Sequence, residues 1–465
     1  MRRKSTGPSS NDGEDRISRL PNALIHHILS FMDMKYVVQT SVLSKRWIDV
    51  WTTMSTLNFN SYQFLTRENG VSEIQIGSFA NFINEIFILR GDSSINKFHV
   101  DWNEETHKPR THTIPISNHM NTWIIAAVRH AVQDLSVQIR SRASMILRLP
   151  HCLLNSQSLT KLVLKHQPNY TKISLPNSMS LPRLKLLSLS MFYVEEVKLL
   201  NELISSCPVL ESLILANISV GMGDDVNLNI ESRDLKHFYL HSKGRGINHP
   251  RHTMAKVIKL STPNLTSLIC HDYMIQEYFL ENLSSLVTAK IKMTKENDRD
   301  LSYGDELSYL ERSEEEKEDL YPKRMMKMLR ALHNMEKLTL SASFVQVLSK
   351  APGLTQCQPP QFHSLQWLKL TTCLTRGCLA AITYLLKISP KLESLILMSK
   401  ERRIADVDDD WEARLSLPCT LSHLKFVEIQ QLQGCNNEFK FVEFLRKNGA
   451  VLEEMVLWFR FSKRS

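Results

Sequence analysis

Three histidines have spacings that could place two imidazole rings on one ligand. His237 and His241 stand four residues apart, which on a helix would suit a zinc ion. Their surroundings predict a strand instead, and a strand rising about 3.3 Å per residue separates the two rings by roughly 13 Å. His241 and His271 each follow the last apolar residue of neighbouring expected strands, so stacking in register would bring them roughly 5 Å apart. Such a pair could bind a metal or an anion, or simply line a protein-binding surface.

Other residue types that carry chemistry lack the patterns that chemistry needs. Cys373 and Cys378 have no matching second pair of cysteines, so they do not predict a zinc site. The eight cysteines never form a C-x-x-C pair, and we expect reduced, buried thiols of a cytosolic or nuclear protein. The sequence contains no G-x-x-x-x-G-K-[ST], H-E-x-x-H or G-x-S-x-G motif. We therefore expect a protein without catalytic residues, metal or cofactor.

The elements that position the histidines follow from a repeated apolar-x-x-apolar-x-apolar pattern. Its best copies begin at Leu159, Leu184, Leu210, Leu235, Leu265 and Leu286, at intervals of 25, 26, 25, 30 and 21 residues. Later copies begin at Met335, Leu365, Leu392, Leu424 and Leu452, and two weaker copies begin at Ile95 and Val132. This is the period of leucine-rich repeats. It predicts an α/β fold, in which short strands with one buried face stack into a curved parallel sheet.

The unburied positions of these strands predict a surface for capturing a partner. Aromatic and cationic side chains recur there, a composition that suits a partner segment bearing carboxylates or phosphates. The alternative is a solvated sheet face with no dominant contact. The predicted substrate-binding residues are His237, Tyr239 and His241, then Ile269 and His271, then Lys290 and Lys292, and finally Trp367 and Lys369.

Charge is distributed unevenly along the 465 residues. Formal net charge is +9, but residues 295–319 hold eleven acidic and four basic side chains, which leaves +16 on the remainder. We expect the segment near 295–320 to be a mobile acidic insertion. The basic residues elsewhere are scattered singly, which does not favour nucleic-acid binding. The first fourteen residues predict a disordered basic tail without a secretory signal, and no apolar run is long enough to span a membrane.

The segment from 15 to 51 carries more apolar surface than three short helices can bury. Pro21 suits the first position of a helix with two apolar stripes, Leu24, Ile28 and Phe31 on one, and Ile25, Leu29 and Met32 on the other. One stripe can face the segment's own core and the other is left for a partner. A second apolar cluster follows Ser41 and Ser44 as possible helix caps and comprises Val42, Leu43, Trp47, Val50 and Trp51.

This segment resembles an F-box, through Leu20-Pro21, Ile28 to Phe31 and Ser41 to Trp47 with Trp51. It departs from the family only where Asp33, Met34 and Lys35 replace the usual link. The resemblance implies docking on a Skp-type adaptor, and through it on a cullin and RING subunit, to form a ubiquitin ligase. The alternative is the core of an ordinary helical hairpin. By the resemblance, the residues at or just behind the adaptor interface are Leu20, Pro21, Ile28, Leu29, Val42, Leu43 and Trp47.

The carboxyl-terminal stretch contains Leu417-Pro418-Cys419, Gly434, Phe441-Val442, Phe444-Leu445 and Leu452-Glu453. With these residues it resembles the FBD segment of plant F-box proteins with leucine-rich repeats. We expect two strands around a helix from Glu438 to Lys447, covering the open end of the repeat stack and hiding its edge. The predicted divisions are a tail at 1–14, an F-box at 15–60, repeats at 61–415 and an FBD segment at 416–465. The resemblance implies a non-catalytic receptor that selects protein substrates for ubiquitination in the nucleus or cytoplasm. The alternative is a scaffold, or a small-molecule receptor, that acts without ubiquitin transfer.

Overall fold

The structure is a computed structural model that describes residues 20–68, 71–103, 116–141, 146–221, 227–242, 257–295, 314–351, 361–372, 376–399, 421–434 and 436–460. The chain forms two compact units. Unit 1 contains residues 1–143 and 150–163, and unit 2 contains residues 144–149 and 164–465. No described helix combines the length and the apolar composition that crossing a membrane requires.

Unit 1 begins with two short helices and three 3₁₀ turns. These are α1 (Asn22–Leu29), α2 (Met34–Gln39), η1 (Thr40–Val42), η2 (Lys45–Trp47) and η3 (Val50–Thr53). Asp33 caps α2, since its carboxylate accepts from the Lys35 N–H at 2.8 Å, and it also accepts from the Asn60 N–H at 2.7 Å. The departure from the usual F-box link is therefore a helix cap that also fixes the following strand.

Three local expectations for this segment are corrected by the structure. Pro21 stands at the N-cap of α1 rather than at its first helical position. Neither serine caps through its side chain, because Ser41 lies inside η1 and Ser44 precedes η2 without a side-chain hydrogen bond. Both serine hydroxyl oxygens are buried without a hydrogen-bond partner. The turns are 3₁₀ and only three residues long, too short to present the free N–H groups that a longer helix offers a cap.

Unit 1 continues with parallel strands β1 (Thr56–Asn60), β4 (Lys97–Asn103) and β5 (Asp134–Ser141). Their return connections include α3 (Ile76–Leu89), α4 (Ile116–Arg129) and α5 (His151–Leu154), with a hairpin of β2 (Leu65–Glu68) and β3 (Val71–Ile74) after η4 (Ser61–Phe64). Buried rings of Phe79, Trp102 and Trp123 pack together between the sheet and the helices. The weak copies at Ile95 and Val132 are confirmed as β4 and β5. Strand β1 was not predicted, although Met54-x-x-Leu57-x-Phe59 follows the same pattern.

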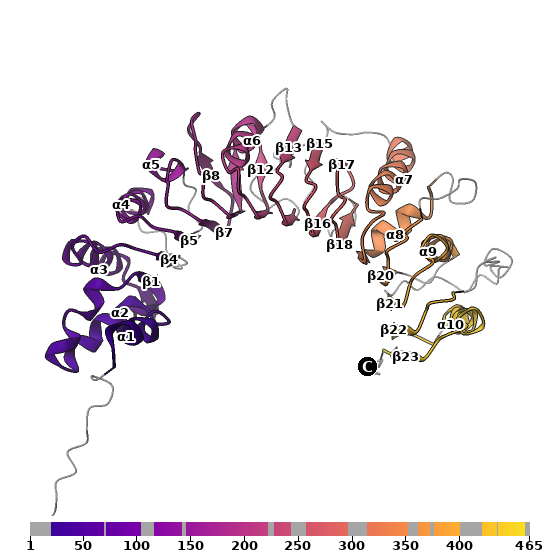
Figure 1. The fold of residues 1–465 in the computed structure, drawn as a ribbon, viewed down its shortest axis with the longest axis horizontal. Coiled ribbons are helices and arrows are strands. Elements are labelled where there is room, and N and C mark those ends of the chain that lie inside the picture. The colour runs from indigo at the N-terminus through magenta and orange to yellow at the C-terminus, as the bar shows by residue number, and fades with distance from the viewer. Residues whose placement is uncertain are drawn as a thin grey trace, which may run out of the picture. The chain divides into compact units, whose positions relative to one another are not determined.

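Unit 2 contains a large parallel sheet, and every repeat copy from Leu184 onward forms one of its strands. Strand β7 (Lys161–Pro168), in which the boundary between the units falls, contains the copy at Leu159 and lies beside β9. The predicted α/β repeat fold is confirmed, and Figure 1 shows the strands side by side. In spatial order they are β9 (Leu186–Ser190), β11 (Ser212–Ala216), β14 (His237–His241), β16 (Ser267–Tyr273), β18 (Thr288–Thr294), β19 (Lys337–Leu340), β20 (Trp367–Thr372), β21 (Ser394–Ser399), β22 (Phe426–Leu432) and β23 (Glu454–Phe459).

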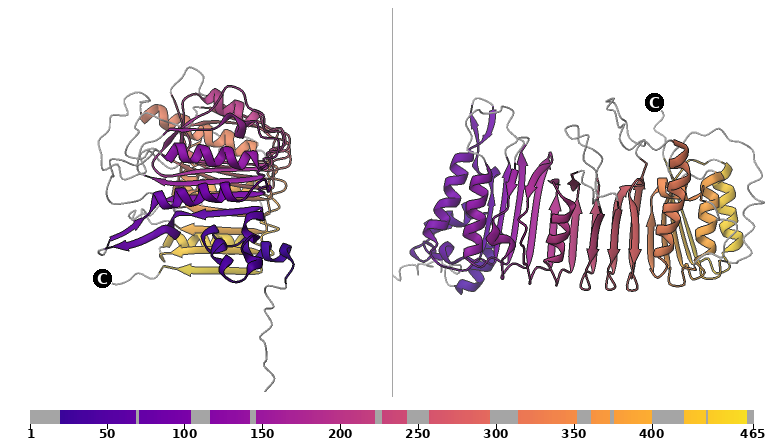
Figure 2. Two further views of the ribbon diagram at one scale, coloured as in Figure 1. Left: turned by 90° about the vertical axis from the view of Figure 1, so that its left-hand side faces the viewer. Right: turned by 90° about the horizontal axis from the view of Figure 1, so that it is seen from above.

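A second layer covers one face of this sheet. Around β9 to β18 it consists of two short parallel sheets, one of β6 (Ile146–Arg148), β8 (Thr171–Ser174), β10 (Phe192–Val194) and β12 (Ser219–Val220), the other of β13 (Asn227–Glu231), β15 (Val257–Ser261) and β17 (Glu277–Glu281). The helices of this layer are α6 (Val197–Ser205), α7 (Glu314–Ala331), α8 (Ala342–Leu348), α9 (Arg376–Lys387) and α10 (Asn436–Asn448). Figure 2 shows α7 to α10 covering the part of the sheet nearest the carboxyl end.

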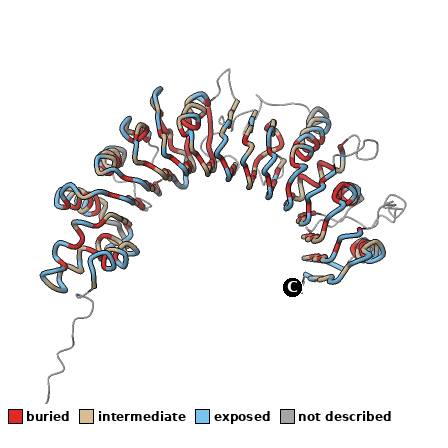
Figure 3. Tube along the Cα trace, in the orientation of Figure 1, coloured by how far each residue is buried: buried red, intermediate tan, exposed pale blue. Residues whose placement is uncertain are grey.

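The core of unit 2 lies between these two layers, along the buried positions in Figure 3. In β11 and β14, Leu213 pairs with Phe238 and Leu215 pairs with Leu240, and all four side chains are buried. The alternating positions face the opposite side, which no described helix covers (Figure 1). We call this second side the open face.

The acidic segment expected near 295–320 falls mostly on residues 296–313, outside the described residues. Its last part is helical, because α7 begins at Glu314. The Glu318 carboxylate lies 2.9 Å from the Lys350 ammonium group, and Tyr321, one turn further on, is buried.

The carboxyl-terminal strand, helix and strand are confirmed as β22, α10 and β23. They extend the large sheet, with Val427 paired to Met455 and Ile429 paired to Leu457 in parallel register. The expectation that this segment hides the edge of the sheet is therefore wrong. Strand β23 is itself the last strand, and none of the described residues pairs with its outer edge.

Candidate functional site

The helices at the start of unit 1 leave one apolar stripe in solvent. Ile25 and Leu29 of α1 are buried, whereas Leu24, Ile28 and Phe31 are exposed, with Phe31 at 77%. The two stripes expected from the sequence are thus divided between core and surface. The exposed apolar side chains of this segment, which we call the helical apolar surface, are Leu24, Ile28, Phe31, Tyr36, Val42, Leu43 and Ile48.

The seven predicted adaptor residues differ in their exposure to solvent. Pro21, Ile28, Val42 and Leu43 are exposed, and Val42 reaches 88% exposure, while Leu20 is half-buried. Leu29 and Trp47 are only 3% and 5% exposed, so they support the surface from beneath. Tyr36 and Ile48 belong to the surface but were not singled out from the sequence. A helical pattern does not show which side chains of a short turn become buried and which stay exposed.

Arg46 holds the two parts of this surface together. Its guanidinium donates to the Leu20 carbonyl oxygen at 2.5 Å and to the Asn22 side-chain oxygen at 2.6 Å. These bonds connect η2 to the first turn of α1, residues separated by more than twenty positions in the sequence. The positions of Val42 and Leu43 next to α1 are thereby defined by polar contacts that leave the apolar side chains free to meet a partner.

On the open face of unit 2, the register places the predicted substrate-binding residues in adjacent rows. Tyr239 pairs with Ile269, which pairs with Lys290, and His241 pairs with His271, which pairs with Lys292. Strand β19 lies between β18 and β20, so Lys290 is followed by Thr339 and then by Lys369. His237, Trp367 and Lys337 share a further row nearer the strand starts. Lys337 was missed, although its repeat had been recognised.

The expected proximity of His241 and His271 is seen in the structure. Their ring centroids are 5.4 Å apart and their Nδ1 atoms 3.2 Å apart, so one ring donates to the other. The Tyr239 ring stacks beside His241 with a centroid distance of 6.1 Å. Burial, and then the charges of His241, Lys290 and Lys292, lower the pKa of His271 to about 4. At neutral pH this imidazole is therefore uncharged.

A metal centre would need further ligands beside these two histidines. No group of three or more His, Cys, Asp or Glu side chains with metal-binding geometry occurs in the described part of the chain. Cys378 is buried, and Cys373 lies outside the described residues. Cys207 and Cys270 are buried free thiols, whereas Cys152 is exposed on the short helix α5, contrary to the expectation of burial.

A polar cluster beneath the open face was not predicted. Tyr278 donates to the Asp272 carboxylate, and the Cys270 thiol donates to the Tyr278 hydroxyl at 3.3 Å. Burial raises the pKa of Asp272 to about 6 and also raises that of the Cys270 thiol. The three groups are sealed in the core, where no substrate reaches them, so they are structural. The sequence signal was the alternation from buried Cys270, which puts Asp272 on the same buried side.

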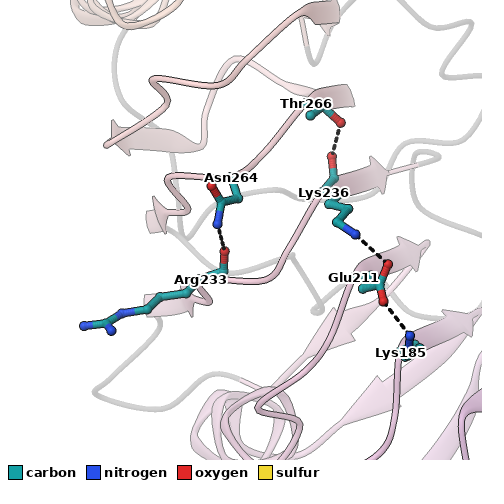
Figure 4. Close-up of polar contacts among 6 residues, drawn as sticks. All are labelled: Lys185, Glu211, Arg233, Lys236, Asn264 and Thr266. Carbon is teal, nitrogen blue, oxygen red and sulfur yellow. Dashed lines mark hydrogen bonds and ion pairs between the residues drawn. The ribbon is translucent and has the colours of Figure 1, made fainter.

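Other lysines of unit 2 form ion pairs just before the strands begin (Figure 4). The Glu211 carboxylate lies 2.9 Å from both the Lys185 and the Lys236 ammonium groups. Hydrogen bonds from Lys185 and Lys236 lower the pKa of Glu211 to about 2. Thr266 and Asn264 continue this edge by donating to the carbonyl oxygens of Lys236 and Arg233. These contacts join one repeat to the next and give both lysines an acidic partner.

Comparison with known proteins matches three parts of the chain to family models. Residues 17–58 match the F-box domain, and residues 414–457 match the FBD segment. Residues 120–291 match the leucine-rich repeats of FBD-associated F-box proteins of the At5g56370 type.

Relatives in Arabidopsis thaliana match over most of their length. The F-box/LRR-repeat protein At3g58930 is 26% identical, covering 95% of this chain and 89% of its own. The F-box/LRR-repeat protein At3g59210 is 28% identical, covering 84% of this chain and 75% of its own. The order of F-box, repeats and FBD segment is thus the same as that expected from the sequence.

Proposed function

Because this chain belongs to the plant F-box, FBD and leucine-rich-repeat family, we propose that it is the substrate-recognition subunit of a Skp–cullin–F-box ubiquitin ligase. In this role the F-box docks on a Skp-type adaptor, which connects to a cullin and a RING subunit. The repeats capture a protein substrate in the nucleus or cytoplasm. The chain itself forms and breaks no bond.

One observation carries the adaptor half of this proposal. The helical apolar surface exposes Val42, Leu43, Ile28 and Phe31 together on a segment whose core residues, among them Ile25, Leu29 and Trp47, are buried. Burying a side chain of this size contributes about 1.5–3 kcal/mol, so a few such anchors suffice for a tight complex. An adaptor with a complementary apolar groove is the partner that this surface fits.

The contribution to the ligase reaction is proximity. A receptor that holds a substrate lysine close to the charged ubiquitin-conjugating enzyme converts a bimolecular encounter into an effectively intramolecular one. No polar constellation among the described residues offers a further chemical role, since the buried Cys270, Asp272 and Tyr278 are closed to substrate.

The experiment that tests this function compares two forms of the full chain in plant cells with the proteasome inhibited. One form is native and the other carries Val42→Arg with Leu43→Arg. We expect the native form to co-purify with a Skp-type adaptor and a cullin, and the variant to lose both while accumulating captured substrates. Equal recovery of adaptor and cullin with the two forms would contradict the proposal.

A further inference from the structure

We infer that the open face of unit 2 binds a phosphorylated segment of the substrate, with the phosphate held between Lys290 and Lys292. This inference rests on the proposed function, because it names the substrate class of the same repeats. We call the residues involved the cationic face: Tyr239, His241, His271, Lys290, Lys292, Lys337, Trp367 and Lys369.

In the part of the chain that the structure describes, the lysines of the cationic face lack the kind of acidic partner that Lys185 and Lys236 have at the entry of the strands. Lys185 and Lys236 pair with Glu211. Within the described residues, no ion pair or hydrogen bond occupies the ammonium groups of Lys290, Lys292, Lys337 and Lys369. Lys290, Lys292 and Lys337 are exposed, and Lys369 is half-buried.

No acidic residue interrupts this face over most of the sheet. The open-face positions of β9, β11, β14, β16, β18, β19, β20 and β21 include no Asp or Glu, and the first carboxylates in this direction are Glu428 and Glu454. Other acids, Glu211, Glu336 and Glu393, stand just before the strands at their entry edge. Positive charges on adjacent strands without counter-charges favour an anionic ligand.

Side chains beside the lysines support an anion rather than a cation. His271 lies next to Lys292 in the register, and its pKa is lowered partly by the charges of Lys290 and Lys292. A bound anion would relieve this repulsion. The hydrogen-bonded His241 and His271 pair and the Tyr239 ring beside it form a polar and aromatic flank against which an extended segment can pack.

The spacing of the lysines favours a phosphate over a single carboxylate. Lys290 and Lys292 are alternate residues of β18, so their backbones are separated by roughly 7 Å and two flexible side chains can converge on one group. A phosphate monoester carries about −1.5 to −2 charges at neutral pH and can accept from both ammonium groups. A carboxylate would satisfy only one of the two charges.

The aromatic residues predict what flanks the phosphorylated residue. Tyr239 on β14 and Trp367 on β20 each lie two strands from β18 in the sheet order. With about 4.8 Å between strands and about 3.3 Å between residues, Tyr239 lies one register row from the phosphate position and roughly 10 Å from it, the length of about three extended residues. Trp367 shares the row of Thr288, three rows from the phosphate position, and lies roughly 14 Å away, the length of about four extended residues. We therefore expect apolar side chains about three residues to one side of the phosphorylated residue and about four residues to the other.

The test uses the full chain in complex with a Skp-type adaptor. The probe is a degenerate peptide library with a fixed phosphoserine, leucine three residues to one side and leucine four residues to the other, in both orders, compared with the same library unphosphorylated. We expect at least about 10-fold enrichment of the phosphorylated library on the native complex, and loss of that enrichment with Lys290→Glu plus Lys292→Glu. The matched control is Lys259→Glu plus Lys323→Glu, which changes two exposed lysines away from the open face by the same charge.

Each outcome of this test is decisive. Equal retention of the two libraries, or equal loss in the control variant, would overturn the inference. Inositol hexakisphosphate serves as a free polyphosphate probe, and binding of this compound at Lys290 and Lys292 without phosphopeptide enrichment would also overturn it, in favour of a small-molecule ligand. Adaptor recovery is measured in the same preparations, so failure of the peptide arm with adaptor bound leaves the proposed function standing.

Discussion

The helical apolar surface of unit 1 and the cationic face of unit 2 differ in the free energy that each can supply. The first exposes Val42 and Leu43 on short turns that Trp47 supports from below. The second presents Lys290 and Lys292 on one strand, β18, whose alternating residues Ala289, Ile291 and Met293 are buried. Apolar burial contributes affinity, whereas exposed charge contributes mainly specificity and association rate. The two surfaces should therefore respond to opposite perturbations.

Charged substitutions on the helical apolar surface should have the largest effect. We expect Val42→Arg with Leu43→Arg to weaken adaptor binding roughly 1000-fold, about 4 kcal/mol, because two apolar anchors are lost. Titration calorimetry with a purified adaptor measures this. Ile88→Arg with Leu89→Arg is the control, since these α3 residues are 76% and 62% exposed but lie outside that surface. Comparable weakening by the control pair would show that exposed apolar residues in general, rather than this surface, bind the adaptor.

Removing a buried leucine from β11, the strand beside β14 of the cationic face, should have the next largest effect, on stability. Leu213 is fully buried between the layers, while its neighbour Ile214 lies on the open face. We expect Leu213→Ala to lower the free energy of unfolding by about 3 kcal/mol, within the range of about 2–5 typical of such cavities. Ile214→Ala should cost much less. Urea unfolding of both variants measures this, and similar losses would mean that the open face is packed against something.

The buried carboxyl beneath the cationic face should make unit 2 sensitive to pH. Burial raises the pKa of Asp272 to about 6, above its value in the unfolded chain of about 3.9. Between these values the folded state binds more protons, so its stability falls as pH rises, by up to about 3 kcal/mol at neutral pH.

Asp272→Asn removes that titration. Relative to that of the native chain, the free energy of unfolding of the variant should rise by up to about 3 kcal/mol as the pH increases from about 4 to about 7. Urea unfolding of both proteins at the two pH values measures this change. A native-to-variant difference that stays constant with pH would show that Asp272 does not titrate in this range.

The smallest expected effect is a difference between the two surfaces in how strongly salt weakens binding. Raising sodium chloride from about 50 mM to about 500 mM screens exposed charges, so we expect phosphopeptide binding to the cationic face to weaken roughly 10-fold. Adaptor binding through Val42 and Leu43 should change by less than about 3-fold, because apolar burial is not screened. Fluorescence anisotropy at both salt concentrations measures each partner, and equal salt dependence would remove the distinction between the surfaces.

The strands of the large sheet could be predicted because the apolar side chains at the first, fourth and sixth positions of the repeated pattern must be buried. The proximity of His241 and His271 followed from the same register. Strand β1 was missed because Leu57 and Phe59 fell inside a segment explained by helices. The short strands of the second layer carry no such repeated pattern, and their pairing depends on contacts between neighbouring repeats.

The surfaces were only partly predictable for a related reason. Helical periodicity separates Ile25 from Ile28, but only the folded turns show that Trp47 is buried while Val42 is exposed. The pairing of Glu211 with Lys185 and Lys236 depends on side-chain contacts across three repeats. Sequence spacing fixes which residues are adjacent in the sheet, and it does not show which charges remain unpaired.

The most direct test of the account is reconstituted ubiquitin transfer with a substrate captured from plant cells. The native chain, adaptor, cullin, RING subunit and conjugating enzyme are combined, and ubiquitin on the captured protein is measured. We predict transfer with the native chain and with the Ile88→Arg plus Leu89→Arg control, and none with Val42→Arg plus Leu43→Arg. Undiminished transfer by the Val42 and Leu43 variant, or no transfer by a native chain that has bound the adaptor and the substrate, would contradict the account.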